Sequence, residues 1–187
     1  IARVIGPTID VPAPDVYTTS QMMGWIMDEY SEVIGQFSPG VVTGKPVLIG
    51  GSRGRNEATG RGVVITIMEA LRHLGLDPKQ STFVIQGFGN VGANTALLLD
   101  ELGCKIIAVS DSKGAVLDGN GLDPNKVLEF KDKTGSVVGF PGAKQISNSD
   151  LLKLECLVLV PAALENQITT ENAALIKAKI VAEAANA

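Results

Sequence analysis

Three glycines within six residues follow a run of apolar β-formers and precede a run of helix formers. Gly87, Gly89 and Gly92 match the pattern G-x-G-x-x-G, with a predicted strand over 82–86 and a predicted helix over 91–102. The first glycine of this pattern permits a tight turn, the second lets the backbone approach a pyrophosphate, and the third lets the helix pack closely on the strand. The predicted binding loop comprises Gly87, Phe88, Gly89, Asn90, Val91 and Gly92.

An acidic residue stands where a dinucleotide site needs one. Asp111 lies nineteen residues beyond Gly92, after a second predicted strand over 105–109, and its carboxylate can accept hydrogen bonds from ribose hydroxyls. Ser112 and Lys113 follow directly and could serve a 2′-phosphate equally well, so NAD and NADP both remain open as cofactors. The alternative is that the glycines serve only a tight turn between strand and helix.

Alternating strands and helices dominate the chain after residue 56. Further strands are expected over 157–160 and 179–183, and further helices over 58–74, 122–133, 150–154 and 170–177. This alternation is typical of βαβ units around a parallel sheet. The predicted fold is therefore α/β, a Rossmann-like doubly wound sheet.

The first third of the chain reads differently. Residues 1–11 have an extended character, and the stretch PAPD that ends at Asp15 is a rigid loop because its prolines exclude helix. Thr19 and Ser20 then provide a helix N-cap before an amphipathic stretch, and 38–55 is rich in glycine and proline. We expect residues 1–55 to end a preceding α/β substrate domain with its hinge, and residues 56–187 to form the dinucleotide-binding domain.

Composition argues against several classes of partner. Sixteen basic and twenty acidic side chains give a net charge of −4 without a basic stripe, so nucleic acid is not an expected partner. No stretch approaches eighteen uncharged apolar residues, which predicts no membrane association and a cytoplasmic location. Cys104 and Cys156 lack a CxxC spacing or a neighbouring histidine, so no metal site is expected.

Several longer motifs, taken together, carry a family resemblance along the whole chain. They resemble the glutamate dehydrogenases of the Glu/Leu/Phe/Val amino-acid dehydrogenase family. The resemblance implies reversible oxidative deamination of L-glutamate to 2-oxoglutarate and ammonia, with hydride transfer to NAD or NADP, in a homo-oligomer that is usually a hexamer. The motifs are DVPAPDVYTTSQMMGWIMDEYS, GVVTGKP, GGSRGRNEATGRGV, GFGNVG, AVSDSKG, VLVPAALENQI and AEAAN.

The resemblance also implies residue roles. Asp15 matches the catalytic aspartate, which exchanges protons with the amino group and with the intermediates that follow hydride transfer; a turn-capping role is the alternative. Thr59 and Asn90 match contacts to the nicotinamide carboxamide and its ribose, although Thr59 could instead cap the helix that follows. Ala162, Ala163 and Asn186 stand at the ends of later strands, on the edge where such sheets bind their cofactor.

The chain departs from the family pattern at both ends. The glycine- and lysine-rich segment that binds the substrate carboxylates has no counterpart here, and neither does the C-terminal segment that returns to the first domain. We therefore expect an internal fragment that is inactive in isolation. A leucine, phenylalanine or valine dehydrogenase and a non-catalytic nucleotide-binding module are the alternatives.

Overall fold

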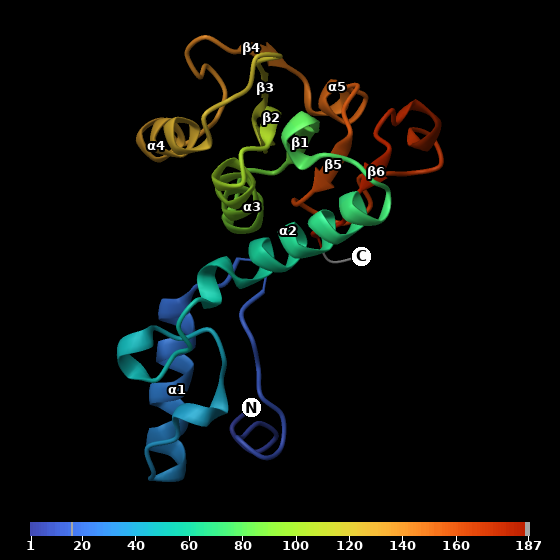
Figure 1. The fold of residues 1–187 in the computed structure, drawn as a ribbon. Coiled ribbons are helices and arrows are strands. Elements are labelled where there is room, and N and C mark those ends of the chain that lie inside the picture. The colour runs from blue at the N-terminus through green and yellow to red at the C-terminus, as the bar shows by residue number, and fades with distance from the viewer. Residues whose placement is uncertain (16, 186–187) are drawn as a thin grey trace. The chain divides into compact units, whose positions relative to one another are not determined.

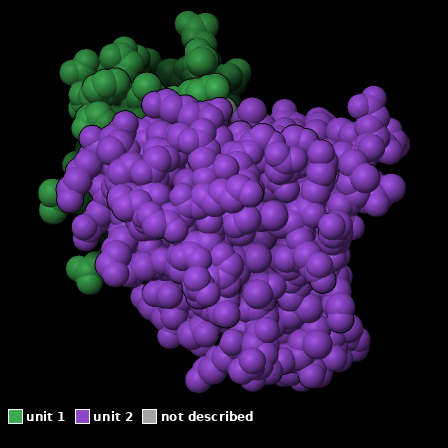
Figure 2. Space-filling view, turned by 90° about the horizontal axis from the view of Figure 1, so that it is seen from above, with its two compact units in different colours: residues 1–56 green, residues 57–187 purple. Residues whose placement is uncertain are grey.

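The chain divides into two compact units, residues 1–56 and residues 57–187 (Figure 2). A computed structural model describes residues 1–15 and 17–185. Helix α2 (Arg55–His73) begins at the end of the first unit and runs into the second. The basic residues Arg72 and His73 stand in its last turn, where the Arg72 guanidinium lies at the negative end of the helix dipole, and Gly75 follows with φ 66°.

A six-stranded sheet forms the centre of the second unit (Figure 1). Its order is β4-β3-β2-β1-β5-β6, in which β1, β2, β5 and β6 are parallel and the β2–β3 and β3–β4 pairs are antiparallel. The strands are β1 (Thr82–Gln86), β2 (Lys105–Asp111), β3 (Gly114–Leu117), β4 (Lys144–Ile146), β5 (Val158–Pro161) and β6 (Ile180–Val181). The α/β fold predicted from the glycine pattern and the alternation is confirmed.

Helices cover both faces of this sheet (Figure 1). On one face, α2, α3 (Asn90–Glu101) and α4 (Pro124–Thr134) contribute apolar side chains to a core that includes Phe83 and Ile85 of β1. On the other face, α5 (Asn148–Leu152) packs with Val84 of β1. Because β1 is hydrogen-bonded on both sides and buried on both faces, residues 83–85 are continuously apolar.

Two strands and one helix differ from the sequence prediction. Strands β3 and β4 were not expected: the two-residue turn at 112–113 sends the chain back along β2 as a hairpin, so the sheet is mixed. The helix predicted over 170–177 is wrong, since only a 3₁₀ turn, Ala173–Leu175, forms there. The side chain of Asn172 accepts from Thr169 N–H and donates to the Gln167 carbonyl, so local side-chain bonds compete with the helical ones.

The first unit contains one long helix, α1 (Ser20–Ile34), with two 3₁₀ turns, Pro39–Val41 and Val47–Ile49. The predicted cap is confirmed, because Thr19 Oγ1 accepts from Met22 N–H, and Gly35 ends the helix at φ 70°. The extended character predicted for residues 1–11 is wrong, because hydrogen-bonded turns from Val4 to Ile1 and from Ile9 to Gly6 replace it. No helix of the described part of the chain is long and apolar enough to cross a membrane.

Candidate nucleotide-binding site

The carboxyl ends of β1, β2 and β5 meet at one edge of the sheet. From β1 the chain passes through α3 to β2 on one side, while β5 pairs with β1 on the other, so the strand order reverses at β1. Open α/β sheets bind their ligands in the crevice at such a point. The loop after β1, Asp111 at the end of β2 and the pair Ala162–Ala163 after β5 all belong to this edge.

Gly87 joins the loops that follow β1 and β5. Its φ is 90°, and a Cβ placed on it would lie 2.7 Å from the Ala162 carbonyl oxygen and 2.9 Å from Ala163 Cβ. The Gly87 N–H donates to Ser110 Oγ of β2 at 3.1 Å. Only glycine combines this backbone conformation with this closeness, so the turn links all three strands of the crevice.

The other two glycines of the motif have opposite surroundings. A Cβ on Gly92 would lie 1.8 Å from the Gly87 carbonyl oxygen, so the first turn of α3 packs directly on the Gly87 turn. A Cβ on Gly89 would meet no atom of the described residues within 4 Å, and Gly89 is the N-cap of α3 without a side-chain cap. The positive end of the helix dipole therefore faces an open cradle, which suits the charge and size of a phosphate group.

The remaining loop residues differ in exposure. Phe88 is fully buried, and its carbonyl accepts a hydrogen bond from Lys131 Nζ of α4. Val91 is half-buried, whereas Asn90 is exposed and its Oδ1 and carbonyl accept from Asn94 Nδ2 at 3.1 and 2.8 Å. A pocket of about 330 Å³ adjoins the loop; it is lined by Phe88, Gly89, Asn90, Ala93, Asn94, Leu97, Leu128, Lys131 and Asp132.

Asp111 is anchored by backbone donors. Its Oδ1 accepts from Lys113 N–H at 2.8 Å and its Oδ2 from Val137 N–H at 2.7 Å. Partial burial raises the pKa of this carboxyl, but these two N–H groups, with Ser136 and the Lys131 ammonium, outweigh burial and hold the pKa below its ordinary value. Asp111 is therefore a fixed anion at neutral pH, next to the exposed Ser112.

The partners of Asp111 and Phe88 were missed by sequence reasoning. Lys131 and Val137 belong to α4 and the segment after it, 20 and 26 residues beyond Asp111. Neither position carries a motif of its own. Their contacts arise because α4 packs beside α3, and that packing brings its C-terminal end to the loop.

Thr59 lies on α2, where the helix approaches α3. The neighbouring Gly60 packs so closely that a Cβ on it would lie 3.0 Å from Asn94 Cβ and 3.0 Å from Thr95 N. The alternative in which Thr59 caps this helix is wrong, because α2 already begins at Arg55. Thr59 is exposed, one helical turn into α2.

Asp15 belongs to the first unit and lies in a turn held by a hydroxyl. Its N–H donates to Thr18 Oγ1 at 2.7 Å, and the same hydroxyl donates to the Asp15 carbonyl at 2.6 Å. The preceding Pro14 packs on Gly44, where a Cβ would lie 2.3 Å from Pro14 Cγ. Asp15 is exposed. The predicted site residue Asn186 lies outside the described residues.

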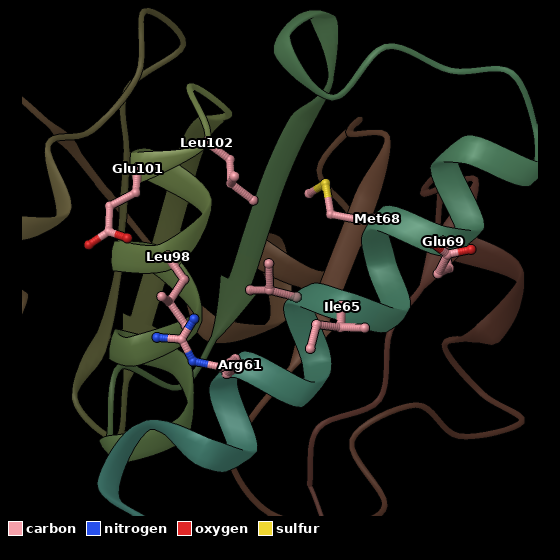
Figure 3. Close-up of a pocket in the computed structure, with 8 residues that line it drawn as sticks. Arg61, Ile65, Met68, Glu69, Leu98, Glu101 and Leu102 are labelled. Atoms are coloured by element: carbon pink, nitrogen blue, oxygen red, sulfur yellow. The ribbon is translucent and has the colours of Figure 1, made fainter. Parts of the chain in front are cut away.

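A second pocket, of about 360 Å³, lies between α2 and α3 (Figure 3). Apolar side chains such as Ile65, Met68 and Leu98 line it together with the charged side chains of Arg61 and Glu101 (Figure 3). None of the predicted cofactor residues lines it. It is therefore separate from the candidate nucleotide-binding site.

Metal ligands do not cluster in the described part of the chain: residues 1–15 and 17–185 contain no group of three or more His, Cys, Asp or Glu side chains that could hold an ion. Cys104 and Cys156 are free and buried. Burial raises the pKa of each thiol to about 11, so both are protonated at neutral pH.

Comparison with known proteins gives the family. A family model described as Glutamate/Leucine/Phenylalanine/Valine dehydrogenase matches residues 50–187. The chain belongs to this dehydrogenase family. A second model, described as Glu/Leu/Phe/Val dehydrogenase, dimerisation domain, matches residues 1–32. The resemblance read from the motifs is confirmed.

Glutamate dehydrogenases are among the relatives of this chain. It is 50% identical to the cryptic catabolic NAD-specific glutamate dehydrogenase of Bacillus subtilis and 50% identical to the glutamate dehydrogenase of Thermotoga maritima, with all of this chain covered in both. It spans 43% and 45% of their lengths. The solved structure of the hetero-hexameric glutamate dehydrogenase of Thermus thermophilus, with Leu bound, has a TM-score of 0.91 to this chain at 37% identity. The matched region covers 99% of this chain and 44% of the Thermus chain.

Proposed function

We propose that this chain binds NAD or NADP at the carboxyl edge of its sheet and is part of a glutamate dehydrogenase, which oxidatively deaminates L-glutamate to 2-oxoglutarate and ammonia. The observation that carries the proposal is the open cradle at Gly89, bounded by the N-terminus of α3 and by the Gly87 turn. The proposed substrate rests on the names of the relatives, which are glutamate dehydrogenases. The proposed binding of the cofactor phosphates rests on the cradle at the helix N-terminus.

Asp111 favours NAD over NADP. Its carboxylate is anionic and fixed, and each oxygen retains acceptor capacity beyond its backbone hydrogen bond. Such a group accepts hydrogen bonds from free ribose hydroxyls but repels a 2′-phosphate. The Bacillus subtilis relative is named NAD-specific, in agreement with this preference.

Asp15 would exchange protons with the substrate. Deamination of an amino acid removes a hydride from Cα, adds water to the resulting iminium and releases ammonia, and each step after hydride transfer moves a proton. A carboxyl group can donate and accept these protons, and the backbone of Asp15 is held in its turn by the Thr18 hydroxyl. The NAD or NADP bound at the cradle would supply the hydride acceptor.

Oligomer formation is also part of the proposal. One solved relative is hetero-hexameric, and the model that matches residues 1–32 describes a dimerisation domain.

Turnover of leucine or phenylalanine in preference to glutamate would favour the other amino-acid dehydrogenases. Binding of cofactor without any turnover in the full-length protein would favour a non-catalytic nucleotide-binding module.

The test of cofactor binding is the substitution Gly89→Ala. Within the described part of the chain its Cβ meets no atom closer than 4 Å, and its φ of −84° suits alanine, so folding should be unaffected. The methyl group occupies the cradle and should weaken NADH binding at least about tenfold. NADH fluorescence measures the affinity, and circular dichroism in urea measures stability.

The matched control is Gly62→Ala on α2, which likewise adds a methyl group into open space but lies away from the loop. It should leave NADH affinity unchanged. A wild-type chain that fails to bind NADH, or a Gly89→Ala variant that binds it with undiminished affinity, would contradict the proposed function.

A further inference from the structure

Gln86 is a buried polar residue that follows three buried apolar residues in β1. It ends β1 directly before Gly87, between β2 and β5, and it is 5% exposed. Its backbone carbonyl accepts from Ala162 N–H at 2.8 Å. Its side chain therefore lies within the sheet's core next to the loop that follows β5.

The side-chain amide of Gln86 holds that loop. Gln86 Nε2 donates to Gln167 Oε1 at 2.8 Å, across 81 residues of sequence. Gln167 Nε2 donates to the Glu165 carbonyl at 3.2 Å, and this bond determines which atom of the Gln167 amide faces Gln86. The segment 162–167, which includes both alanines of the crevice, is thus attached to β1 at both of its ends.

The other atom of the Gln86 amide is unsatisfied. Gln86 Oε1 is buried and has no hydrogen-bond partner among the described residues. A buried acceptor without a partner costs free energy, whereas a leucine of similar volume would not incur that cost. Stability alone therefore does not account for a glutamine here, and exceptions of this kind concentrate at functional sites.

We propose that Gln86 is a positioning residue for the cofactor crevice, acting through Gln167 to hold the segment 162–167 at the carboxyl end of β1. The inference rests on the proposed function, because the crevice matters only if it binds a dinucleotide. A Cβ placed on Gly87 would lie 2.7 Å from the Ala162 carbonyl oxygen and 2.9 Å from Ala163 Cβ. A shift of the segment 162–167 therefore alters the crevice wall directly.

Affinity and stability should separate in the variant Gln86→Leu. It loses the bond to Gln167 but also loses the unsatisfied buried oxygen, so its urea midpoint should equal or exceed that of the wild type. NADH affinity should fall about fivefold or more, the size expected when one bond of a network is removed. A residue with only a structural role would lose stability as well.

The partner variant and a control complete the experiment. Gln167→Leu should weaken NADH binding by a similar factor, and the double variant should be no weaker than either single one, because both changes remove the same bond. Gln145→Leu, an exposed glutamine of β4, is the matched control and should bind NADH like the wild type. NADH fluorescence and circular dichroism in urea are measured for all five chains.

Each outcome decides a different question. Three results would each overturn the positioning role. They are wild-type NADH affinity in Gln86→Leu, a urea midpoint of Gln86→Leu that falls together with its affinity, and additive losses of affinity in the double variant. A wild-type chain that does not bind NADH would overturn the proposed function itself. Reduced affinity at undiminished stability, absent in the Gln145 control, would support the inference.

Discussion

A methyl group added at Gly92 should push α3 away from β1. The third glycine of the loop lies in the first turn of α3, and a Cβ there would be 1.8 Å from the Gly87 carbonyl oxygen and 3.2 Å from Ile85 Cγ2. Real Cβ atoms essentially never approach another atom closer than 3.0 Å, so helix and turn must separate by at least about 1.2 Å. Gly87 is itself tightly packed, because a Cβ on it would lie 2.7 Å from the Ala162 carbonyl oxygen.

The cost of Gly92→Ala follows from this geometry. Overpacking in a core typically costs about 1–3 kcal/mol, and here the obstacle is backbone, which cannot rotate aside. Alanine returns up to about 1 kcal/mol through its better helix propensity, so the net loss in the free energy of unfolding should be about 1–2 kcal/mol. With a urea m-value of about 2 kcal/mol/M, the midpoint should fall by about 0.5–1 M.

NADH affinity should fall with stability in this variant. A displacement of more than 1 Å moves the N–H groups of the α3 N-terminus away from the phosphates, for which we expect a loss of at least about tenfold. Circular dichroism should follow unfolding, because the single tryptophan, Trp25, lies in the first unit and does not report on the second.

Three glycine-to-alanine variants then have three distinct signatures. Gly92→Ala should lose stability and affinity, Gly89→Ala affinity alone, and Gly62→Ala neither. A Gly92→Ala chain with the wild-type urea midpoint and wild-type NADH affinity would refute the steric reasoning.

The remaining predictions concern the two acidic residues. Asp111 has a lowered pKa in the folded chain, so its contribution to stability is complete above the ordinary pKa of about 4 and is lost as the pH falls through the folded value. Asp111→Asn should therefore lower the urea midpoint at pH 7 and flatten the decline of that midpoint between pH 5 and 2. An unchanged dependence of the midpoint on acid pH would contradict the anchoring of Asp111 by backbone donors. Asp15→Asn in the full-length protein should reduce glutamate-dependent NADH formation by about 100-fold or more with NADH affinity retained, whereas undiminished turnover would remove Asp15 from the chemistry.

Local stereochemistry explains which parts of the fold were predictable. The spacing of Gly87, Gly89 and Gly92 predicted strand, turn and helix correctly, because each glycine answers a steric requirement within a few residues of itself. The Thr19 cap of α1 is equally local. Strand β3 is only four residues long and leaves no periodic pattern, so its pairing with β2 was missed.

Long-range contacts explain what was missed at the candidate site. The sequence pointed to Asp111 but gave no sign of Val137, which donates to it from 26 residues away. Gln86 read as the last residue of a strand, and its bond to Gln167 spans 81 residues. Such pairs follow from how strands and helices are packed, and a single sequence carries no signal for them.

The position of β1 at the reversal of strand order also bears on the timing of assembly. One wall of the crevice, the Gly87 turn, belongs to a β1–α3–β2 unit in which Thr82 pairs with Lys105, 23 residues away. The other wall, Ala162, joins only after Phe83 pairs with Val158 of β5, 75 residues away. During synthesis β1 therefore emerges and finds one neighbour well before the other, and closing the longer loop costs more entropy. We expect the crevice to be the last part of the sheet edge to form. A dinucleotide that binds only the completed edge would therefore stabilise the newly made chain at a late step of its folding.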